Sequence, residues 1–429
     1  MSDFDAIVVG SGLAGASAAI ELARAGKSVL VVERGNFSGA KNMTGGRIYT
    51  HSLYKLFPDG FEDAPLERKV THERISLMSE NSNMTIEFSS DELDVKGRES
   101  YTILRAPFDE WMQAQAEEAG AEYINGIAVE QLVKDEDGKV IGILAGEDEV
   151  TADVVLLCDG VNSLLTGQAV GYARPPASMM AVGVKDVFAL PEEVIDDRFG
   201  CAPGEGAAWL FAGDATHGLF GGGIIYTNRD SLSVGIVVGI EAVATKGRHS
   251  VSQMLQDFEE RPEIAPYLKG AKRVEHSGHM VPEGGLKMMP KLVSDGVIIA
   301  GDAAMMCVNL GYTVRGMDYA VEAGRIAGIS AAEALNVGDT SKEVLQLYVD
   351  ALEDSFVMKD LRMFENEPEF MEGFDRMFCG YPQLARDVMN KMFVVDGPAG
   401  RLKDAAVPPI RQIGLLNVLS DARRAMRAL

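Results

Sequence analysis

The sequence predicts an α/β fold: a mainly parallel sheet covered by helices, an inserted antiparallel β-sheet domain and a helical C-terminal region. Three observations predict it. An apolar strand, a glycine-rich turn and a small-residue helix follow one another near the N-terminus. Strand-like segments recur between residues 181 and 240, with a turn among them. From residue 340 onward the pattern is mainly helical.

The first element is a buried strand over Ala6–Val9, which leads into the run Gly10-Ser11-Gly12-Leu13-Ala14-Gly15. In such a turn the first glycine allows the tight bend, the second lets the backbone approach a pyrophosphate, and the third lets the next helix pack against the strand. That helix is expected over Ala16–Ala25, and the N–H groups at its start suit phosphate oxygens. These residues predict a Rossmann-like dinucleotide site.

The second strand ends at Glu33, 18 residues after Gly15. An acid about 20 residues beyond the turn accepts hydrogen bonds from the adenosine ribose in this kind of site. Strand, turn, helix and acid are therefore in register. This combination is more specific than a glycine motif alone.

Length and composition limit the remaining possibilities. The chain has 429 residues, 47% apolar and 24% charged, which indicates a globular protein of two or three domains. Its net charge of −24 argues against nucleic acid. Four scattered cysteines predict a reducing, cytoplasmic compartment. We expect no secretory signal, and any membrane contact is expected to be peripheral, because no run approaches the ~18 apolar residues of a spanning helix.

The elements between the two halves of the nucleotide-binding region follow in order. A helix is expected from Pro107, as its first residue, to about Gly120. An antiparallel meander is expected over residues 127–144, and then a buried strand over 153–157 that stops before Asp159-Gly160.

The inserted domain and the return to the parallel sheet complete the fold. Expected strands of the insert cover residues 181–190, 207–212, 222–227 and 232–240, with a helix near 251–260. A buried strand over 296–300, the pair Gly301-Asp302 and a helix over 317–335 then resume the first domain. The predicted domains are residues 1–171 and 276–339 (nucleotide-binding), 172–275 (insert) and 340–429 (helical).

The pair Gly301-Asp302 distinguishes a flavin site from a nicotinamide site. An aspartate between a buried strand and a helix is placed to bond a ribityl hydroxyl, although it could also be an ordinary helix cap. Together with the N-terminal motif and Asp159-Gly160 it favours FAD. The predicted fold is therefore a Rossmann-like FAD-binding domain with an inserted antiparallel β-sheet domain and a helical C-terminal region.

At this point a resemblance becomes specific. The motifs at residues 10–33, 159–160 and 301–302 resemble the glutathione-reductase-type flavoprotein superfamily. Three further stretches resemble the electron-transfer-flavoprotein:quinone oxidoreductases, in particular the stand-alone FixC-type branch: Gly39 to Gly46, Val281-Pro282-Glu283-Gly284-Gly285 with Pro290-Lys291-Leu292, and Gly316 to Gly324.

The resemblance implies partners. The mitochondrial-type enzymes carry a fused ferredoxin-like domain with an iron–sulfur cluster, whereas no cysteine ligand spacing occurs here before Leu429. A separate ferredoxin-like iron–sulfur subunit is therefore implied, with the two subunits of an electron-transfer flavoprotein, a quinone acceptor and peripheral contact with the inner face of the cytoplasmic membrane. We assign no metal site.

The flavin itself carries redox chemistry, so no catalytic side chain is assigned. Arg315-Gly316 opens a helix at Met317 whose N-terminus would favour negative charge on reduced flavin. The fused relatives have threonine at that methionine. The resemblance adds Lys41, Asn42 and Arg105, for which a solvated loop is the alternative, and Asn309 could reach the flavin or be a turn residue. The full predicted cofactor set is Gly10, Ser11, Gly12, Leu13, Ala14, Gly15, Glu33, Arg34, Lys41, Asn42, Arg105, Val129, Asp159, Gly160, Gly301, Asp302, Asn309, Arg315, Gly316 and Met317.

Three segments stay open between two interpretations. The loop over residues 286–292 either enters a lipid headgroup layer or packs on the protein. Gly221-Gly222-Gly223 suits a close ligand or a bend in the sheet. The end of the chain, with six Lys or Arg against two Asp over residues 401–429 and an apolar stripe, either docks an acidic subunit or anionic lipid, or packs on its own domain.

The sequence thus predicts an FAD-dependent oxidoreductase that passes electrons from an electron-transfer flavoprotein to a membrane quinone, within an electron-bifurcating complex. A geranylgeranyl-reductase-like polyprenyl reductase is the alternative with the same fold, and a flavin hydroxylase is less favoured. A non-catalytic, flavin-containing assembly subunit is the alternative of another class.

Overall fold

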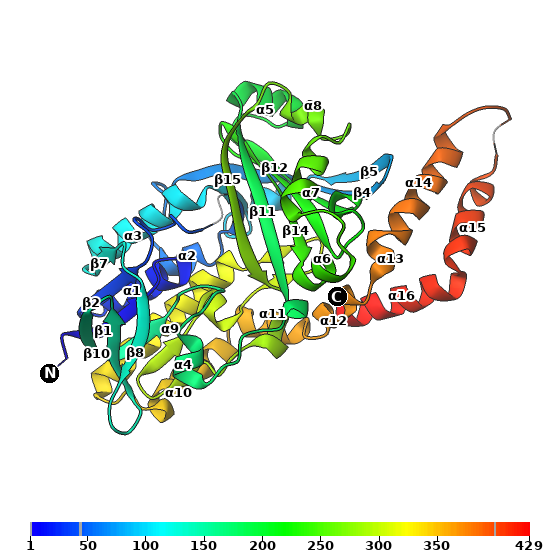
Figure 1. Ribbon diagram of the computed structural model, residues 1–429. Coiled ribbons are helices and arrows are strands. Elements are labelled where there is room, and N and C mark those ends of the chain that lie inside the picture. The colour runs from blue at the N-terminus through cyan, green and yellow to red at the C-terminus, as the bar shows by residue number, and fades with distance from the viewer. Residues whose placement is uncertain (1, 43–44, 399) are drawn as a thin grey trace.

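A computed structural model describes residues 2–42, 45–398 and 400–429, so Met43 and Thr44 of the predicted flavin loop lie outside the described residues. Two sheets dominate the molecule, and helices cover the first of them (Figure 1). None of the helices in these ranges is long and apolar enough to cross a membrane.

The first sheet is the predicted parallel sheet. Its strand order is β16-β17-β10-β1-β2-β7, and the five strands from β17 to β7 run parallel. Antiparallel β8 and β9 form the predicted meander with β10. The strands are β1 (Phe4–Val9), β2 (Val29–Glu33), β7 (Glu122–Asn125), β8 (Val129–Lys134), β9 (Val140–Ala145), β10 (Asp148–Leu157), β16 (Val293–Ser294) and β17 (Val297–Ile299).

The helices on this sheet are α1 (Leu13–Arg24), α3 (Arg105–Ala119) and α9 (Met317–Val337). Helices α1 and α9 approach closely, because a Cβ at Gly324 would lie 2.0 Å from the Ala14 carbonyl oxygen. Helix α3 begins at Arg105, two residues before the predicted start at Pro107. Proline is tolerated there because the N–H groups of the first turn have no intrahelical acceptor.

The second sheet contains the predicted antiparallel strands. Its order is β15-β11-β14-β13-β12-β4-β6-β3, with β5 paired to β4. The predicted strands are confirmed as β11 (Met180–Ala189), β12 (Glu205–Gly213), β13 (Gly221–Thr227) and β14 (Ser231–Gly239), and α7 (Val251–Glu259) is the predicted helix.

Sequence reasoning missed the other strands of this sheet: β3 (Gly46–Tyr49), β4 (Leu66–Ser79), β5 (Ser82–Phe88), β6 (Ser100–Ile103) and β15 (Lys272–Pro282). Strand β4 carries inward charges, Arg68 and Arg74, which hide its alternation. The second sheet therefore draws on more of the chain than residues 172–275, and the domain boundaries stay a prediction.

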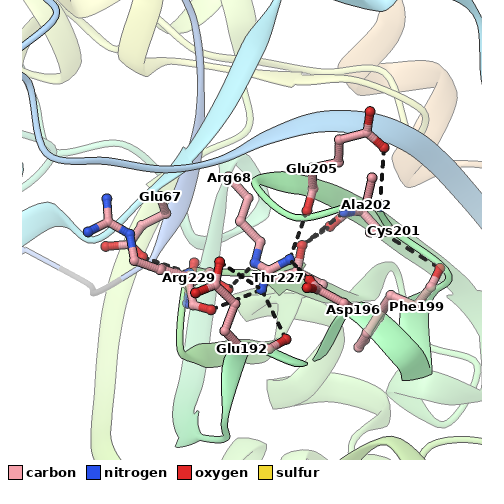
Figure 2. A network of polar contacts seen from close by, with 12 residues as sticks. Glu67, Arg68, Glu192, Asp196, Phe199, Cys201, Ala202, Glu205, Thr227 and Arg229 are labelled. Carbon is pink, nitrogen blue, oxygen red and sulfur yellow. Dashed lines mark hydrogen bonds and ion pairs between the residues drawn. The ribbon is translucent and has the colours of Figure 1, made fainter. Parts of the chain in front are cut away.

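Arg68 explains how β4 is fixed in place (Figure 2). The side chain is 1% exposed, and its Nε donates to the Asn228 carbonyl at 2.6 Å. The other guanidinium nitrogens donate to the carbonyls of Glu205 at 2.9 Å and Arg229 at 3.0 Å, and one forms an ion pair with Asp196. The network ties β4 to the β13–β14 turn and to helix α5 (Glu192–Phe199), as Figure 2 shows.

The C-terminal region is helical, as predicted. Its helices are α10 (Lys342–Glu353), α11 (Phe356–Met363), α12 (Glu367–Glu372), α13 (Asp375–Phe378), α14 (Gly380–Phe393), α15 (Leu402–Ile413) and α16 (Leu415–Ala428). Helices α14, α15 and α16 form an arm that projects from the body in orange and red (Figure 1).

The remaining short elements connect these layers. They are α2 (Leu53–Leu56), η1 (Asp91–Asp94), α4 (Thr166–Val170), η2 (Ala177–Met179), α5 (Glu192–Phe199), η3 (Asp214–Thr216), α6 (Ile240–Lys246), α8 (Ala265–Leu268), η4 (Gly285–Met288), η5 (Gly301–Ala304), β18 (Val308–Asn309) and β19 (Val314–Arg315).

Candidate functional site

The glycine turn between β1 and α1 has the geometry that the sequence predicts. Gly10 has φ of +95°, and a Cβ there would lie 2.4 Å from the Cys158 carbonyl oxygen. A Cβ at Gly15 would lie 1.9 Å from the Gly10 carbonyl oxygen. At Gly12 the nearest heavy atom to such a Cβ is a guanidinium nitrogen of Arg105, 3.9 Å away. The first and third glycines are needed for packing, whereas the second faces open space.

Glu33 lies at the end of β2 against this turn. Its carboxylate accepts hydrogen bonds from the Ser11 N–H at 3.0 Å, the Ser11 hydroxyl at 3.1 Å and the Gly35 N–H at 2.6 Å. A carboxylate has about four acceptor positions, so capacity for a ribose hydroxyl remains. The role of Glu33 as a ribose ligand stays a prediction.

Asn42 and Arg105, which the sequence analysis chose from distant segments, are brought together by a residue that it missed. The fully buried carboxylate of Asp109 accepts two hydrogen bonds from Arg105, at 3.0 and 2.9 Å, and one from Asn42. The signal was available, because residues four apart on a helix share one face. Arg34 and Lys41 are exposed.

Asp159 and Asp302 end two neighbouring strands of the parallel sheet. A Cβ on Gly10 would lie 3.1 Å from the Cα of Asp159, so this acid borders the glycine turn. Burial raises the pKa of Asp302 to about 6, against the opposing effect of Arg105. Among the described residues the Asp302 carboxylate accepts no hydrogen bond. A side chain in this state suits a ligand that brings hydroxyl groups.

The start of α9 lies beside the flavin loop. The Met317 side chain packs over Gly46, where an added Cβ would lie 2.8 Å from its Cε. The Arg315 guanidinium is used elsewhere, in ion pairs with Asp318 and Asp360. Any cofactor contact of the Arg315-Gly316 pair would therefore come from its backbone.

Other predicted positions have local partners. The Asn309 amide donates to the Glu283 carboxylate at 3.3 Å, and Val129 is a buried residue at the start of β8. Gly301 has φ of +67°, and a Cβ there would lie 2.8 Å from the Cβ of Ala14. This close approach brings the Asp302 turn against the N-terminus of α1.

For two of the three segments that the sequence left open, the structure favours packing within the protein. In the loop over residues 286–292, Met288 and Leu292 are buried, which favours packing on the protein, and contact of this loop with lipid stays a prediction. The glycines at 221–223 fit between strands and side chains, since a Cβ at Gly223 would lie 2.9 Å from the Phe258 ring. These glycines therefore allow close packing within the second sheet and against its side chains.

These residues fit an extended dinucleotide. The open space above Gly12 is bordered by the Arg105 guanidinium, whose charge also acts on the Asp302 carboxylate, and no described residue donates to that carboxylate. They match the needs of a pyrophosphate and of a polyol chain. FAD has both.

Comparisons with protein families agree with this geometry. Residues 3–205 match an FAD binding domain, and residues 367–429 match the ETF-QO/FixC family C-terminal domain. The chain is 48% identical to a probable electron transfer flavoprotein-quinone oxidoreductase, YdiS, of Escherichia coli K12, covering 100% of both chains. It is 46% identical to Protein FixC of the same strain, covering 99% of both chains.

Solved structures share the fold. A geranylgeranyl bacteriochlorophyll reductase-like protein of Thermoplasma acidophilum superposes with a TM-score of 0.73 at 18% identity, covering 98% of this chain and 99% of that one. The flavin-dependent brominase Bmp2 superposes with a TM-score of 0.59 at 18% identity, covering 99% and 93%. At this level of identity the likeness concerns the fold alone.

Proposed function

The chain belongs to the ETF-QO/FixC family of FAD-dependent oxidoreductases, and on this premise we propose that it passes electrons from an electron transfer flavoprotein to a membrane quinone. The observation that carries the proposal is 48% identity, over the whole length of both chains, with a relative named as a probable electron transfer flavoprotein-quinone oxidoreductase, together with 46% identity with Protein FixC. Such coverage includes the FAD site, the second sheet and the arm.

When FAD is bound, its ring accepts and releases electrons, so the chain needs no nucleophile. The chain's own residues have binding roles. The N–H groups that start α1 and the Arg105 guanidinium would hold the pyrophosphate. Glu33 would accept from the ribose, and Asp302 from the ribityl chain.

The finer proposal concerns the assembly. We place this chain with the two subunits of an electron transfer flavoprotein and a separate ferredoxin-like iron–sulfur subunit, in an electron-bifurcating complex. The support is the resemblance of residues 39–46, 281–292 and 316–324 to the quinone oxidoreductases. In this scheme the chain accepts the higher-potential electrons.

The arm supports peripheral membrane contact. The end of α14 and the residues after it expose apolar side chains, with Phe393 at 74% and Val395 at 80%, and Leu402 across the tip is also exposed. Helix α16 packs inward through Asp421 and Ala428, and leaves its predicted apolar stripe outward, with Leu416 82% exposed. The six basic residues of residues 401–429 suit anionic headgroups, each worth ~1 kcal/mol near such a surface.

Vesicle flotation tests the membrane contact. The double variant Phe393→Asp, Val395→Asp is expected to reduce binding to phosphatidylglycerol-containing vesicles at least tenfold, about 1.4 kcal/mol. Phe88→Asp, an exposed phenylalanine on β5, is the matched control. Equal binding by all three proteins would remove the arm from the proposal.

Anaerobic absorbance spectroscopy tests the function. FAD-loaded protein is mixed with a reduced electron transfer flavoprotein, then with a quinone analogue, and the oxidised-flavin band is followed. We expect bleaching and then recovery. Reduction by NADPH alone would instead indicate a polyprenyl reductase or hydroxylase, and flavin that never turns over would indicate a non-catalytic assembly subunit.

A further inference from the structure

The second sheet has two unlike faces. On one, Val184, Val234 and Ile236 belong to an apolar core beneath α7. On the other, the edge strand β15 and its neighbour β11 carry polar residues. Lys185 is paired with Ser277 across these strands and Gly183 with His279, and directly opposed residues share one face.

This polar face lies toward the candidate FAD site. The ammonium group of Lys185 donates to the Gly45 carbonyl, which belongs to the flavin loop. Burial, and then the nearby cations Arg105 and Arg34, lower the pKa of His279. Neither His279 nor Lys185 is among the site residues predicted from the sequence.

Lys185 is buried, and none of the ion pairs between described residues involves its ammonium group. It is 3% exposed, and besides the Gly45 carbonyl its ammonium lies 5.8 Å from the centre of the Tyr226 ring. A Cβ at Gly235, on the adjacent strand, would lie 3.1 Å from the Lys185 Cβ, so the glycine makes room for the lysine stem.

A second polar group beside it is also unsatisfied. The Ser277 hydroxyl is buried and has no hydrogen-bond partner among the described residues. A buried cation and an orphan hydroxyl on one sheet face are expensive for the protein alone. They become favourable when a ligand brings acceptor atoms and negative charge.

Resting on the proposed function, we propose that Lys185 contacts bound FAD and stabilises its reduced form. Reduction adds two electrons, and when a single proton accompanies them the flavin carries a negative charge. The Lys185 ammonium would offset that charge in a site from which water is excluded. Lys185 lies beside Gly45, where an added Cβ would be 3.7 Å from the lysine Cδ, and the next residue, Gly46, packs against Met317.

The test measures the midpoint potential of bound FAD with a chemical reductant and redox dyes. Lys185→Met is expected to weaken the preference for reduced over oxidised flavin about tenfold, roughly 30 mV for a two-electron couple. Lys185→Arg should stay within about threefold of the wild type. Lys185→Gln serves if the methionine variant does not fold.

Lys69→Met is the matched control, since Lys69 lies on β4 of the same sheet but is 30% exposed and ion-paired with Asp94. An unchanged potential in both Lys185→Met and Lys185→Gln would overturn the proposal. The titration needs neither electron transfer flavoprotein nor quinone. A wild type that those partners do not reduce would therefore refute the proposed function without affecting this result.

Discussion

Arg68 and Lys185 are both buried cations of the second sheet, yet their surroundings differ. Arg68 is paired with Asp196 and donates to the backbone carbonyls of a turn and a helix (Figure 2). Lys185 donates to a single carbonyl, that of Gly45, among the described residues. The protein satisfies the first charge by itself and leaves the second incompletely satisfied.

The difference separates a structural charge from a functional one. Removing one member of a satisfied buried pair destabilises the fold, whereas an incompletely paired charge in the interior indicates a ligand. Asp302 repeats the second pattern with the opposite sign, because burial raises its pKa to about 6 and no described residue donates to it. The four predictions below test this distinction.

The largest expected effect is a loss of stability when the structural charge, Arg68, is removed. Arg68→Met leaves Asp196 and several carbonyls without their donor, so we expect a loss of about 3–5 kcal/mol in the free energy of unfolding. Urea unfolding of the FAD-loaded protein measures it. Arg229→Met is the control, because that side chain is exposed and, within the described ranges, donates only to the Leu66 carbonyl, at 3.2 Å. Equal losses in the two variants would break the comparison.

Asp302→Asn is expected to act on the ligand. Hydrogen bonds to a charged acceptor contribute about 1.5–3 kcal/mol, so the dissociation constant for FAD should rise roughly 10- to 150-fold. The apoprotein should not lose stability, because a carboxylate without a donor is removed. Fluorescence titration and thermal unfolding check the two parts, with Asp295→Asn as the control. A loss of stability without a loss of FAD affinity would show that Asp302 has a structural role.

Gly12→Val sharpens the distinction within the glycine turn. Gly12 has φ of −68°, which any residue adopts, and open space where a side chain would project. Overpacking against the bound pyrophosphate should cost about 1–3 kcal/mol, roughly 5- to 150-fold in the dissociation constant for FAD. The apoprotein should melt as the wild type does. Gly397→Val, in open space on the arm, is the control, and a destabilised Gly12 variant would contradict the prediction.

The last prediction is a pH dependence of stability. Burial and then Arg105 lower the pKa of Lys185 from its ordinary 10.5 to about 7, against the effect of Glu275. Between these values the unfolded chain holds a proton that the folded apoprotein has released, so this group makes stability rise with pH from about 7 to 10. Lys185→Met should flatten that rise and stabilise the apoprotein at neutral pH.

Thermal melts across this pH range, with Lys69→Met in parallel, measure the effect. FAD should stabilise the wild type more than Lys185→Met, because only the wild type gains a partner for the ammonium. A methionine variant with the wild-type pH profile would show that Lys185 is already satisfied by its own chain.

Local patterns made much of the fold predictable. The glycine turn, both flanking strands, the meander and the start of α9 at Met317 each depend on residues adjacent in sequence. The strands β3 to β6 were not predictable in the same way, because β4 interleaves arginines with apolar residues and its partner β12 lies more than a hundred residues away. In the arm, the helical pattern did not locate the break at Gly414 that separates α15 from α16.

The residues of the candidate site also differ in whether local sequence patterns could predict them. Gly10, Gly12, Gly15, Glu33 and Asp302 could be named because one backbone geometry requires them at fixed spacing. Ser277 and Lys185 could not, since their surroundings come from segments far apart in the sequence, and Asp109 was missed although its spacing from Arg105 gave a signal. A lysine within the apolar strand β11 was the available signal, and its neighbours Gly45 and Arg105 come from far earlier in the chain.

By itself, the sequence determined the dinucleotide turn, the parallel sheet and the family, because short-range spacing fixes backbone conformation and recurs among relatives. Only the tertiary structure decided which buried charges are paired within the protein and which are left for a ligand to pair. That property depends on the distance between groups far apart along the chain, and folding alone sets those distances.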